Sequence, residues 1–469
     1  MKRAAALLAV LLLAAACTSS PPPPEPAPAP TTVAPPPASA QKGRTYFGAH
    51  WDWNRYQQFE PYLRKLAGSS TYYELSWCDI EKTQGSPDFS ALDDIAAKSR
   101  ALGIRLDLKI RIGVCWATGG TAQHTRGEAG KTESAMPKDL AAYQGFVTTL
   151  VKRYRPLGVT RYAIENEVNA QQYWTGTPQD YETLVRAAAQ AIHGADPAAQ
   201  VVDSGISSVA MGMGIADRLV EAGQPAQAVA AYDAYFARRI GTRGKQIPRV
   251  NDADDLQAAL AHPVNQRNLA FLAVTGKLLT DKVVQVRQLH FYEHPDGVAP
   301  LLDLLEATTP AGVPISAWEV GRFDKSADPD PAVVADEMTR VTGALAAAGV
   351  VDVVWLPLAF NPGNRAGAEV RAGLLSPEGQ ERPAGVALAG LASAGRGAVA
   401  SPVNQDGLAG VAFSGNGTRI VAWSDGASVP VGLPAKNLDS GAAVTEVGQD
   451  PVLVETDQPL DKALDSLSK

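Results

Sequence analysis

The chain has 469 residues, of which 45% are hydrophobic and 19% charged, and its formal net charge is −7. This length exceeds what one small domain needs, and it accommodates a barrel of about 250 residues with insertions and an appended domain. The lysines and arginines form no basic cluster of the kind that phosphate binding requires. The composition therefore argues against nucleic acid as a partner.

The N-terminus has the features of an export signal. Lys2 and Arg3 precede an apolar run over residues 4–16 that is rich in Ala and Leu. The run is shorter than the roughly 20 residues of a membrane-spanning helix, and it ends in small residues, as secretory signals do. These lead directly into Cys17, which resembles a bacterial lipobox; a plain signal peptide is the alternative. We expect residues 1–17 to be a lipoprotein signal peptide, with lipidated Cys17 anchoring the protein to the outward face of the cell membrane.

Residues 18–42 consist almost wholly of Thr, Ser, Pro, Ala and Val, with proline runs at 21–24 and 35–37. Such a segment buries no core and favours extended polyproline conformations. We predict a linker that holds the following domain away from the membrane. Because no later segment of the sequence is apolar enough for a membrane span, the lipid is the only membrane contact that we expect.

Residues 43–398 alternate strand-like apolar runs with helical stretches, which is typical of a parallel sheet with crossover helices. Eight strands are predicted at residues 45–50, 70–75, 105–112, 161–164, 201–204, 285–291, 314–318 and 351–356. Helices are predicted at residues 91–102, 140–154 and 181–194, and a long helical region, 215–281, separates the fifth and sixth strands. We predict an α/β fold, a (β/α)8 barrel, for which an open doubly wound sheet is the alternative.

Residues 399–469 have a different sequence pattern, with short apolar runs separated by turn residues. Two apolar runs within residues 407–425 flank Asn416-Gly417, a strong hairpin signal. Further strands are predicted at residues 429–431, 443–447 and 452–454. We expect a small all-β domain resembling a sandwich, with a structural role favoured over separate carbohydrate binding.

Cys78 and Cys115 remain once Cys17 is assigned to lipid. Two cysteines are too few for a disulfide framework or a zinc site, and export permits a bond between them. We expect a single Cys78–Cys115 disulfide. Neither a metal-binding spacing nor a glycine-rich phosphate loop is present in the sequence, so no metal and no cofactor are expected.

The reactive groups of a (β/α)8 barrel lie at the C-terminal ends of its strands. The candidate catalytic and substrate-binding residues found there are Trp51, Asp52, Trp77, Arg111, Trp116, Asn166, Glu167, His290, Tyr292, Glu319 and Trp355. Aromatic rings suit the apolar faces of sugars, polar groups suit the hydroxyls, and cleavage of a glycosidic bond needs two flanking carboxylates. The sequence thus predicts a sugar site in which Glu167 and Glu319 face each other across the barrel mouth.

Asn166-Glu167 closing the fourth strand and Glu319 closing the seventh resemble glycoside hydrolase clan A. The resemblance implies that Glu167 is the acid/base, Glu319 the nucleophile and Asn166 a ligand of the sugar 2-hydroxyl. It also implies that Tyr292 contacts the nucleophile and that Trp355 is an aromatic platform. Segments 77–89 and 373–384 are similar to the corresponding stretches of family 39, so that the resemblance covers residues 45–395.

Two features depart from the clan pattern. The usual Trp-Asn-Glu-Pro reads Glu165-Asn166-Glu167-Val168, and the second strand lacks the arginine that often supports the nucleophile. Arg111 on the third strand is the candidate to supply that charge. Strand alternation places Glu165 and Glu167 on one face, and the preceding asparagine favours Glu167 as the acid.

Several candidates keep two interpretations. Trp51, Trp77 and Trp116 can each be a sugar platform or part of the core, and Asp52 can bind a hydroxyl or cap its loop. His290 is expected to contact sugar or Glu319 rather than to act as the base.

The predicted function is retaining hydrolysis of a β-linked glycan of the cell envelope or an exopolysaccharide, without a cofactor. Residues 212–266 are expected to build one wall of the cleft. The alternatives are a catalytically silent glycan-binding envelope protein and a transglycosylase that uses the same covalent intermediate.

Overall fold

A computed structural model of the protein describes residues 43–126, 131–323, 329–360 and 372–467. The predicted signal peptide, Cys17 and the proline-rich linker lie outside these residues. Within them, every helix is too short or too polar to cross a membrane.

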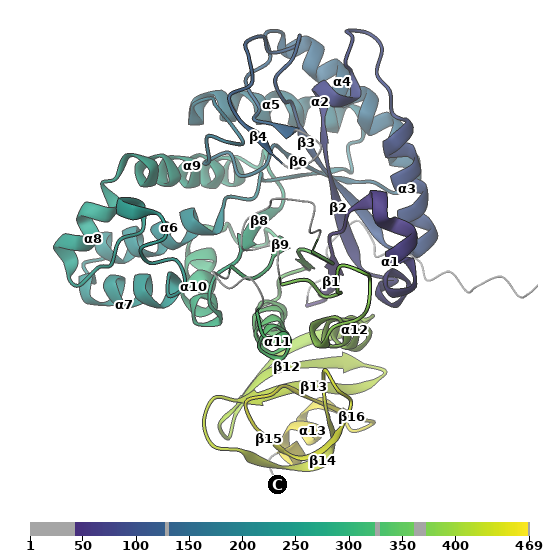
Figure 1. The fold of residues 1–469 in the computed structure, drawn as a ribbon, viewed down its shortest axis with the longest axis vertical. Coiled ribbons are helices and arrows are strands. Elements are labelled where there is room, and N and C mark those ends of the chain that lie inside the picture. Colours follow the sequence, from purple (N-terminus) through teal and green to yellow (C-terminus); the bar gives the residue numbers. More distant parts are fainter. Residues whose placement is uncertain (1–42, 127–130, 324–328, 361–371, 468–469) are drawn as a thin grey trace, which may run out of the picture. The chain divides into compact units, whose positions relative to one another are not determined.

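Eight parallel strands form the barrel, and each overlaps its predicted range (Figure 1). In order around the barrel they are β1 (Tyr46–Ala49), β2 (Ser70–Ser76), β3 (Arg105–Arg111), β6 (Arg161–Ile164), β7 (Gln200–Val202), β8 (Arg287–Phe291), β9 (Ile315–Val320) and β10 (Asp352–Trp355). Single bridges between Val202 and Val286 and between Ile206 and Leu289 connect β7 with β8. Thr71 Oγ1 donates to Ala49 O at 2.8 Å, between β2 and β1. The sheet therefore closes, which confirms the (β/α)8 barrel over the open sheet.

The N-terminal end of the barrel is closed by a buried ionic cluster. Arg105, Arg161 and Asp352 are the first residues of their strands. Asp352 accepts from Arg161 Nη1 at 2.5 Å and from Ser316 Oγ at 2.8 Å, and it also pairs with Arg105. Because buried charges are tolerated only when paired, this end of the barrel is a packed structural layer.

Helices surround the barrel. They are α1 (Tyr56–Leu63), α2 (Trp77–Ile80), α3 (Ser90–Leu102), α4 (Leu140–Tyr154), α5 (Pro178–Ala195), α10 (Val298–Thr308), α11 (Pro331–Ala347) and α12 (Pro383–Gly395). A capping box starts α5, where Thr177 Oγ1 accepts from Asp180 N while the Asp180 carboxylate accepts from Thr177 N. The predicted boundaries of α4 agree with the structure, because its apolar positions recur at helical spacing and Asp139 caps its start.

The connection from β7 to β8 is an insertion rather than one crossover helix. It contains α6 (Ser208–Glu221), α7 (Pro225–Tyr235), α8 (Ala253–Leu260) and α9 (Pro263–Thr280), which lie together beside the barrel (Figure 1). The long helical region predicted between the fifth and sixth strands is thus resolved into four helices.

The C-terminal strands are β11 (Val399–Gln405), β12 (Leu408–Gly415), β13 (Gly417–Ser424), β14 (Val429–Asn437), β15 (Ala443–Val447) and β16 (Val452–Thr456). The predicted hairpin joins β12 to β13, with Gly415 opposite Gly417 and φ of +85° at Gly417. The predicted sandwich is corrected, because all six strands belong to one antiparallel sheet. Helix α13 (Leu460–Leu467) instead buries Ala463 and Leu467 against the apolar residues of the sheet.

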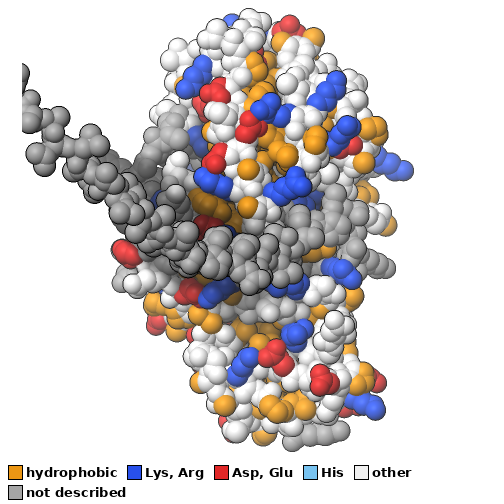
Figure 2. All heavy atoms as spheres, turned by 90° about the vertical axis from the view of Figure 1, so that its right-hand side faces the viewer, with side chains coloured by type: hydrophobic (Ala, Val, Ile, Leu, Met, Phe, Trp, Pro, Cys, Tyr) orange, Lys and Arg blue, Asp and Glu red, His pale blue; other side chains and the backbone are white. Residues whose placement is uncertain are grey.

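The part of the surface drawn in Figure 2 carries lysines and arginines interspersed with acidic side chains. Opposite charges alternate over short distances on this face, in keeping with a sequence that contains no basic run. This distribution gives phosphate no concentrated positive patch on the face shown.

Candidate active site

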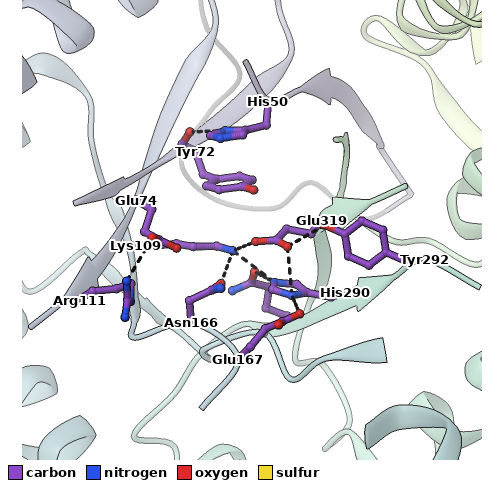
Figure 3. Close-up of polar contacts among 12 residues, drawn as sticks. His50, Tyr72, Glu74, Lys109, Arg111, Asn166, Glu167, His290, Tyr292 and Glu319 are labelled. Carbon is purple, nitrogen blue, oxygen red and sulfur yellow. Dashed lines mark hydrogen bonds and ion pairs between the residues drawn. The ribbon is translucent and has the colours of Figure 1, made fainter. Parts of the chain in front are cut away.

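Two glutamates meet at the C-terminal ends of β6 and β9 (Figure 3). A carboxylate oxygen of Glu167 and one of Glu319 lie within 4.8 Å of each other, and a ring nitrogen of His290 lies within the same distance of both. The Glu167 side chain is 15% exposed and that of Glu319 is 11% exposed. The structure thus brings together the two carboxylates that the sequence predicts to face each other.

Glu319 lies on β9 among hydrogen-bond donors. Lys109 Nζ donates to its Oε1 at 2.5 Å, and the Tyr292 hydroxyl donates to its Oε2 at 2.8 Å. The Nδ1 atom of His290 is 3.4 Å from the same Oε2. Burial by itself would raise the pKa of Glu319, but the neighbouring His290 and Lys109 outweigh it and lower the pKa to about 2. Glu319 is therefore a carboxylate at neutral pH.

Glu167 follows β6 in a strained backbone conformation, with φ of +42°. A non-glycine residue in this region costs about 1–3 kcal/mol and persists only when its surroundings fix it. Here the Glu167 N–H donates to Gly205 O at 3.2 Å, and His290 Nδ1 lies 3.0 Å from Glu167 Oε1. Since Nδ1 faces a carboxylate, it is the ring nitrogen that carries a hydrogen. These contacts direct the carboxylate toward Glu319.

Glu165 does not share the face of Glu167, which corrects the argument from alternation. Strand β6 ends at Ile164, and Glu165 itself has a φ of +67°, so the two-residue repeat of a strand no longer applies. Glu165 Oε1 accepts from Ile112 N at 2.8 Å, and its Oε2 is 3.6 Å from Arg111 Nε. Burial raises the pKa of Glu165 to about 7 despite Arg111.

Arg111 does not supply the charge beside Glu319, contrary to the sequence-based expectation. Its Nη2 donates to Thr132 O at 2.8 Å and to Tyr173 O at 3.2 Å, and its Nη1 is 3.4 Å from Glu74 Oε1. Arg111 thus supports the loops after β3 and β6.

Lys109 is the cation that contacts Glu319, and it was not among the site residues predicted from the sequence. It precedes Arg111 by two residues, so both point into the barrel, with Lys109 one layer deeper. A lysine inside the buried strand RLDLKIRI needs a charge partner. This requirement could have identified Lys109 as a site residue from the sequence.

Asn166 lies beside the same ammonium group. Its Oδ1 accepts from Lys109 Nζ at 2.7 Å. Because an ammonium group only donates, this contact fixes the amide with its oxygen toward Lys109 and its nitrogen away.

His290 and Tyr292 occupy the positions expected of them, at the end of β8 next to Glu319. The Nε2 atom of His290 is 3.1 Å from Gln288 Oε1, and Gln288 Nε2 donates to Asp203 O at 2.7 Å. A register shift between β8 and β9 at Leu289 and His290 brings His290 opposite Glu319. The imidazole is thereby held between the two carboxylates.

Two further residues that sequence analysis did not select lie in this site. His50 stacks on Tyr72 with ring centroids 4.3 Å apart, and Lys109 Nζ lies 4.3 Å from the Tyr72 ring centroid (Figure 3). Burial lowers the pKa of His50 to about 4, so its imidazole is neutral at neutral pH. His50 directly follows β1 and Tyr72 lies inside β2, and neither belongs to a recognisable motif.

The structure places Trp77 in the packed core, and Trp116 packs against it while remaining partly exposed. Trp77 is buried, donates from Nε1 to Glu81 Oε2 at 2.7 Å, and stacks on Phe146 of α4 with centroids 5.5 Å apart. Trp116 donates to Glu81 O at 2.6 Å and meets Trp77 edge-on at 5.4 Å. The local sequence could not distinguish a core tryptophan from a sugar platform, because either role can place an aromatic residue just after a strand.

Trp51 and Trp355 are also buried. Trp51 lies 4.5 Å from Trp53, centroid to centroid, and Trp355 Nε1 donates to Ala372 O at 3.1 Å. Both belong to the main hydrophobic cluster, and neither is seen as an open platform. Asp52 caps its turn by accepting from Asn54 N at 3.0 Å, so the capping interpretation holds.

The Cys78–Cys115 disulfide is confirmed, with Cα atoms 5.7 Å apart. It joins α2, which follows β2, to the loop after β3. Two neighbouring loops at the C-terminal face of the barrel are therefore covalently tied.

Glu167, His290 and Glu319 together offer three atoms that could hold a metal ion. However, the Lys109 ammonium lies 2.5 Å from Glu319 and 3.2 Å from His290 Nε2. A second cation bound there would be repelled at short range in a medium of low dielectric. The described residues therefore suit acid–base and nucleophilic chemistry better than metal binding.

No protein-family model matches the sequence, and no curated protein sequence matches it. Among solved structures, the fold is similar to a family 39 glycoside hydrolase from Bacteroides cellulosilyticus WH2, with a TM-score of 0.59 and 13% identity over 89% of this chain and 81% of that one. A family 39 β-xylosidase from Caulobacter crescentus has a TM-score of 0.56 and 15% identity, covering 90% and 98%. A family 39 enzyme from Xanthomonas axonopodis pv. citri has a TM-score of 0.53 and 13% identity, covering 91% and 96%.

The chain therefore has the fold of the family 39 glycoside hydrolases, a (β/α)8 barrel with a small β-domain. The similarity extends over most of this chain and most of each of those chains. At such low identity it establishes the architecture, and the chemistry has to be argued from the site itself.

Proposed function

We propose that the protein is a retaining glycoside hydrolase in which Glu319 is the nucleophile and Glu167 the acid/base. The observation that carries this proposal is the closeness of the two carboxylates: one oxygen of Glu167 and one oxygen of Glu319 lie within 4.8 Å of each other. Retaining enzymes hold their carboxyl groups about 5–5.5 Å apart, whereas inverting enzymes leave about 6.5–9.5 Å for a water molecule. The short separation favours direct attack by one carboxylate on the sugar.

In the first step, a Glu319 oxygen bonds to the anomeric carbon as the bond to the leaving oxygen breaks. Glu167 gives its proton to that oxygen. The low pKa of Glu319 supports its role as the ionised attacking group. In the second step, water bonds to the anomeric carbon, its proton passes to Glu167, and the bond to Glu319 breaks with return of the electron pair to the carboxylate. Both residues regain their starting states.

The substrate that we propose is a β-linked glycan of the cell envelope or of an exopolysaccharide. The similarity of the fold to a family 39 β-xylosidase supports including β-xylosides among the first compounds tested. Hydrolysis and transfer to a sugar acceptor share the covalent intermediate, so product analysis with and without added acceptor separates the two.

We further propose that the enzyme is exported and anchored to the membrane by lipid on Cys17. The basic start, the short apolar run and the small residues before Cys17 support this location. Metabolic labelling with a fatty acid tests it, with Cys17→Ala as the matched control. Label on the wild-type protein alone is expected, whereas equal labelling of both proteins, or of neither, contradicts the anchor.

The catalytic proposal is tested by intact mass after incubation with 2-deoxy-2-fluoro glycosides. Fluorine at C2 slows both steps, so a retaining enzyme accumulates its glycosyl-enzyme. We expect an adduct on the wild type that maps to Glu319 and is absent from Glu319→Gln. If no sugar of the panel gives an adduct and no envelope glycan is cleaved, the protein is better described as a glycan-binding protein.

A further inference from the structure

We propose that Lys109 is the positioning residue that keeps Glu319 ionised and fixes the orientation of Asn166. This inference rests on the proposed function of Glu319 as the nucleophile. The second strand lacks an arginine that could support Glu319, and Lys109 on the third strand supplies that positive charge instead. The Lys109 side chain is wholly buried and contacts Glu319 and Asn166, so it acts through these two residues.

The first support is the completeness of the contacts around a wholly buried ammonium group. The Lys109 side chain is 0% exposed. Its Nζ lies 2.5 Å from Glu319 Oε1, 2.7 Å from Asn166 Oδ1 and 3.2 Å from His290 Nε2 (Figure 3). The carboxylate and amide oxygens accept from two of its N–H groups, and His290 Nε2 accepts from the third when that nitrogen carries no hydrogen. A buried lysine requires such partners.

The second support is the assignment of the neighbouring cations to other partners. Arg111 pairs with Glu74 and Glu165. Lys131 pairs with Glu74 at 3.1 Å, and its side chain is 40% exposed. Among the described residues, Glu319 therefore forms ion pairs with Lys109 and with the imidazole of His290. Of these two, Lys109 is the ammonium group.

The polar and titratable groups that face Glu319 come from five parts of the barrel. They are His50 after β1, Tyr72 on β2, Lys109 on β3, Glu167 after β6, and His290 and Tyr292 at the end of β8. His50 is neutral at neutral pH because burial lowers its pKa to about 4. Tyr72 and Tyr292 keep their protons because burial raises the pKa of both hydroxyls. The positive charge beside Glu319 thus comes from Lys109 together with His290, the two neighbours that lower the pKa of Glu319.

The contact has a consequence for each step of the reaction. Before attack, the ammonium holds the carboxylate ionised and limits its rotation. In the glycosyl-enzyme Glu319 is an ester without charge, and Lys109 still holds Asn166 Oδ1. When water attacks, the bond between the anomeric carbon and Glu319 breaks, and the ammonium stabilises the carboxylate that re-forms. Removal of Lys109 should therefore slow both formation and hydrolysis of the intermediate.

The kinetic test compares kcat/KM as a function of pH for wild type, Lys109→Met and Lys109→Arg. Methionine keeps the length of the side chain without the charge, and arginine keeps the charge. For Lys109→Met we expect kcat/KM to fall about 100-fold or more, and its acid limb to move upward by about one pH unit or more. Lys109→Arg should leave the acid limb in place even if kcat falls. A role in packing alone would lower activity without moving the limb.

The matched control is Lys131→Met, which removes a positive charge near the site without a recorded contact to Glu319. Its acid limb should coincide with that of the wild type. An acid limb that moves equally in Lys131→Met and Lys109→Met, or in neither variant, would overturn the proposal.

The second test needs no substrate and is a double-mutant cycle on stability. In Lys109→Met the Glu319 carboxylate is buried without its cation, so at pH 7 the midpoint of urea unfolding should fall. Adding Glu319→Gln removes that charge, and the double variant should unfold at higher urea than Lys109→Met alone. If Lys109→Met does not fold, recovery of folding in the double variant supports the proposal. Additive losses, or failure of both variants to fold, contradict it.

The two proposals can fail separately. A wild type that forms no glycosyl adduct and cleaves no envelope glycan, but shows the coupling in the cycle, refutes the hydrolase and retains the ion pair. A wild type that forms the adduct on Glu319 without coupling and without a shifted acid limb refutes the role of Lys109.

Discussion

Glu165 is a buried carboxyl group whose charge the fold opposes, and Glu165→Gln tests this directly. Burial raises its pKa from 4.5 to about 7, in spite of Arg111 and the hydrogen bond from Ile112 N. Glutamine keeps the acceptor for that N–H and carries no charge. The folded protein therefore binds a proton at this position that the unfolded chain releases.

The sign and size of the effect follow from linkage. Because the folded pKa lies above the unfolded pKa, stability is lost as pH rises from about 4.5 to about 7, and the loss is complete above that range. The difference corresponds to an upper limit of about 3 kcal/mol. The folded pKa of about 7 already includes the attraction to Arg111. Because glutamine carries no charge, it avoids the cost of burying an ionised carboxylate, and we expect up to about 3 kcal/mol of net stabilisation at pH 8.

The assay is urea unfolding of the wild type and Glu165→Gln at pH 5 and pH 8, followed by tryptophan fluorescence. The stability of the variant relative to the wild type should increase between the two pH values. A variant equally destabilised at both would show that Glu165 is ionised and that its pair with Arg111 is net stabilising. The glycosyl adduct on Glu319 should still form in this variant, because Glu165 makes its recorded contacts away from that site.

Three other predictions concern catalysis and stability. Glu167→Gln should retain adduct formation with an activated aryl glycoside but lose about 100-fold or more with poor leaving groups, and azide should restore its turnover; equal loss on both substrates would contradict an acid/base role. Tyr292→Phe removes the 2.8 Å hydrogen bond to Glu319 and should slow adduct formation about 10- to 100-fold, measured by time-resolved intact mass; an unchanged rate would show that the bond is dispensable. Replacing both Cys78 and Cys115 by Ser opens a loop with a sequence separation of 37 and should cost up to about 4 kcal/mol in urea unfolding, whereas unchanged stability would indicate an unfolded state that is compact without the bond.

Much of the fold follows from the sequence alone, because its signals are local. Apolar runs of strand length alternate with helical periodicity, and this predicts the eight barrel strands and the ends of helix α4. The Asn416-Gly417 turn predicts the hairpin between β12 and β13. Strand β11 was not predicted, since Pro402 and its polar neighbours obscure the pattern of a strand at the edge of the sheet. The single six-stranded sheet was not predicted either, because its apolar face is covered by helix α13, which the sequence analysis had not identified.

The two glutamates could likewise be predicted, because barrel geometry assigns every strand end to one face of the molecule. Which residues surround them was decided by depth and backbone conformation, which a linear pattern does not contain. Lys109 and Arg111 share one face of β3, and only the closed barrel shows that the deeper residue reaches Glu319.

Glu165 and Glu167 also fit the same alternation, yet positive φ angles after Ile164 turn them to different partners. Trp77 is likewise a rim aromatic in the sequence and a core residue in the structure, because α4 packs against it. The sequence by itself thus determined the barrel and the pair of glutamates at its C-terminal face. The tertiary structure decided the electrostatic neighbours of that pair, since burial and contact across strands arise only when the barrel closes.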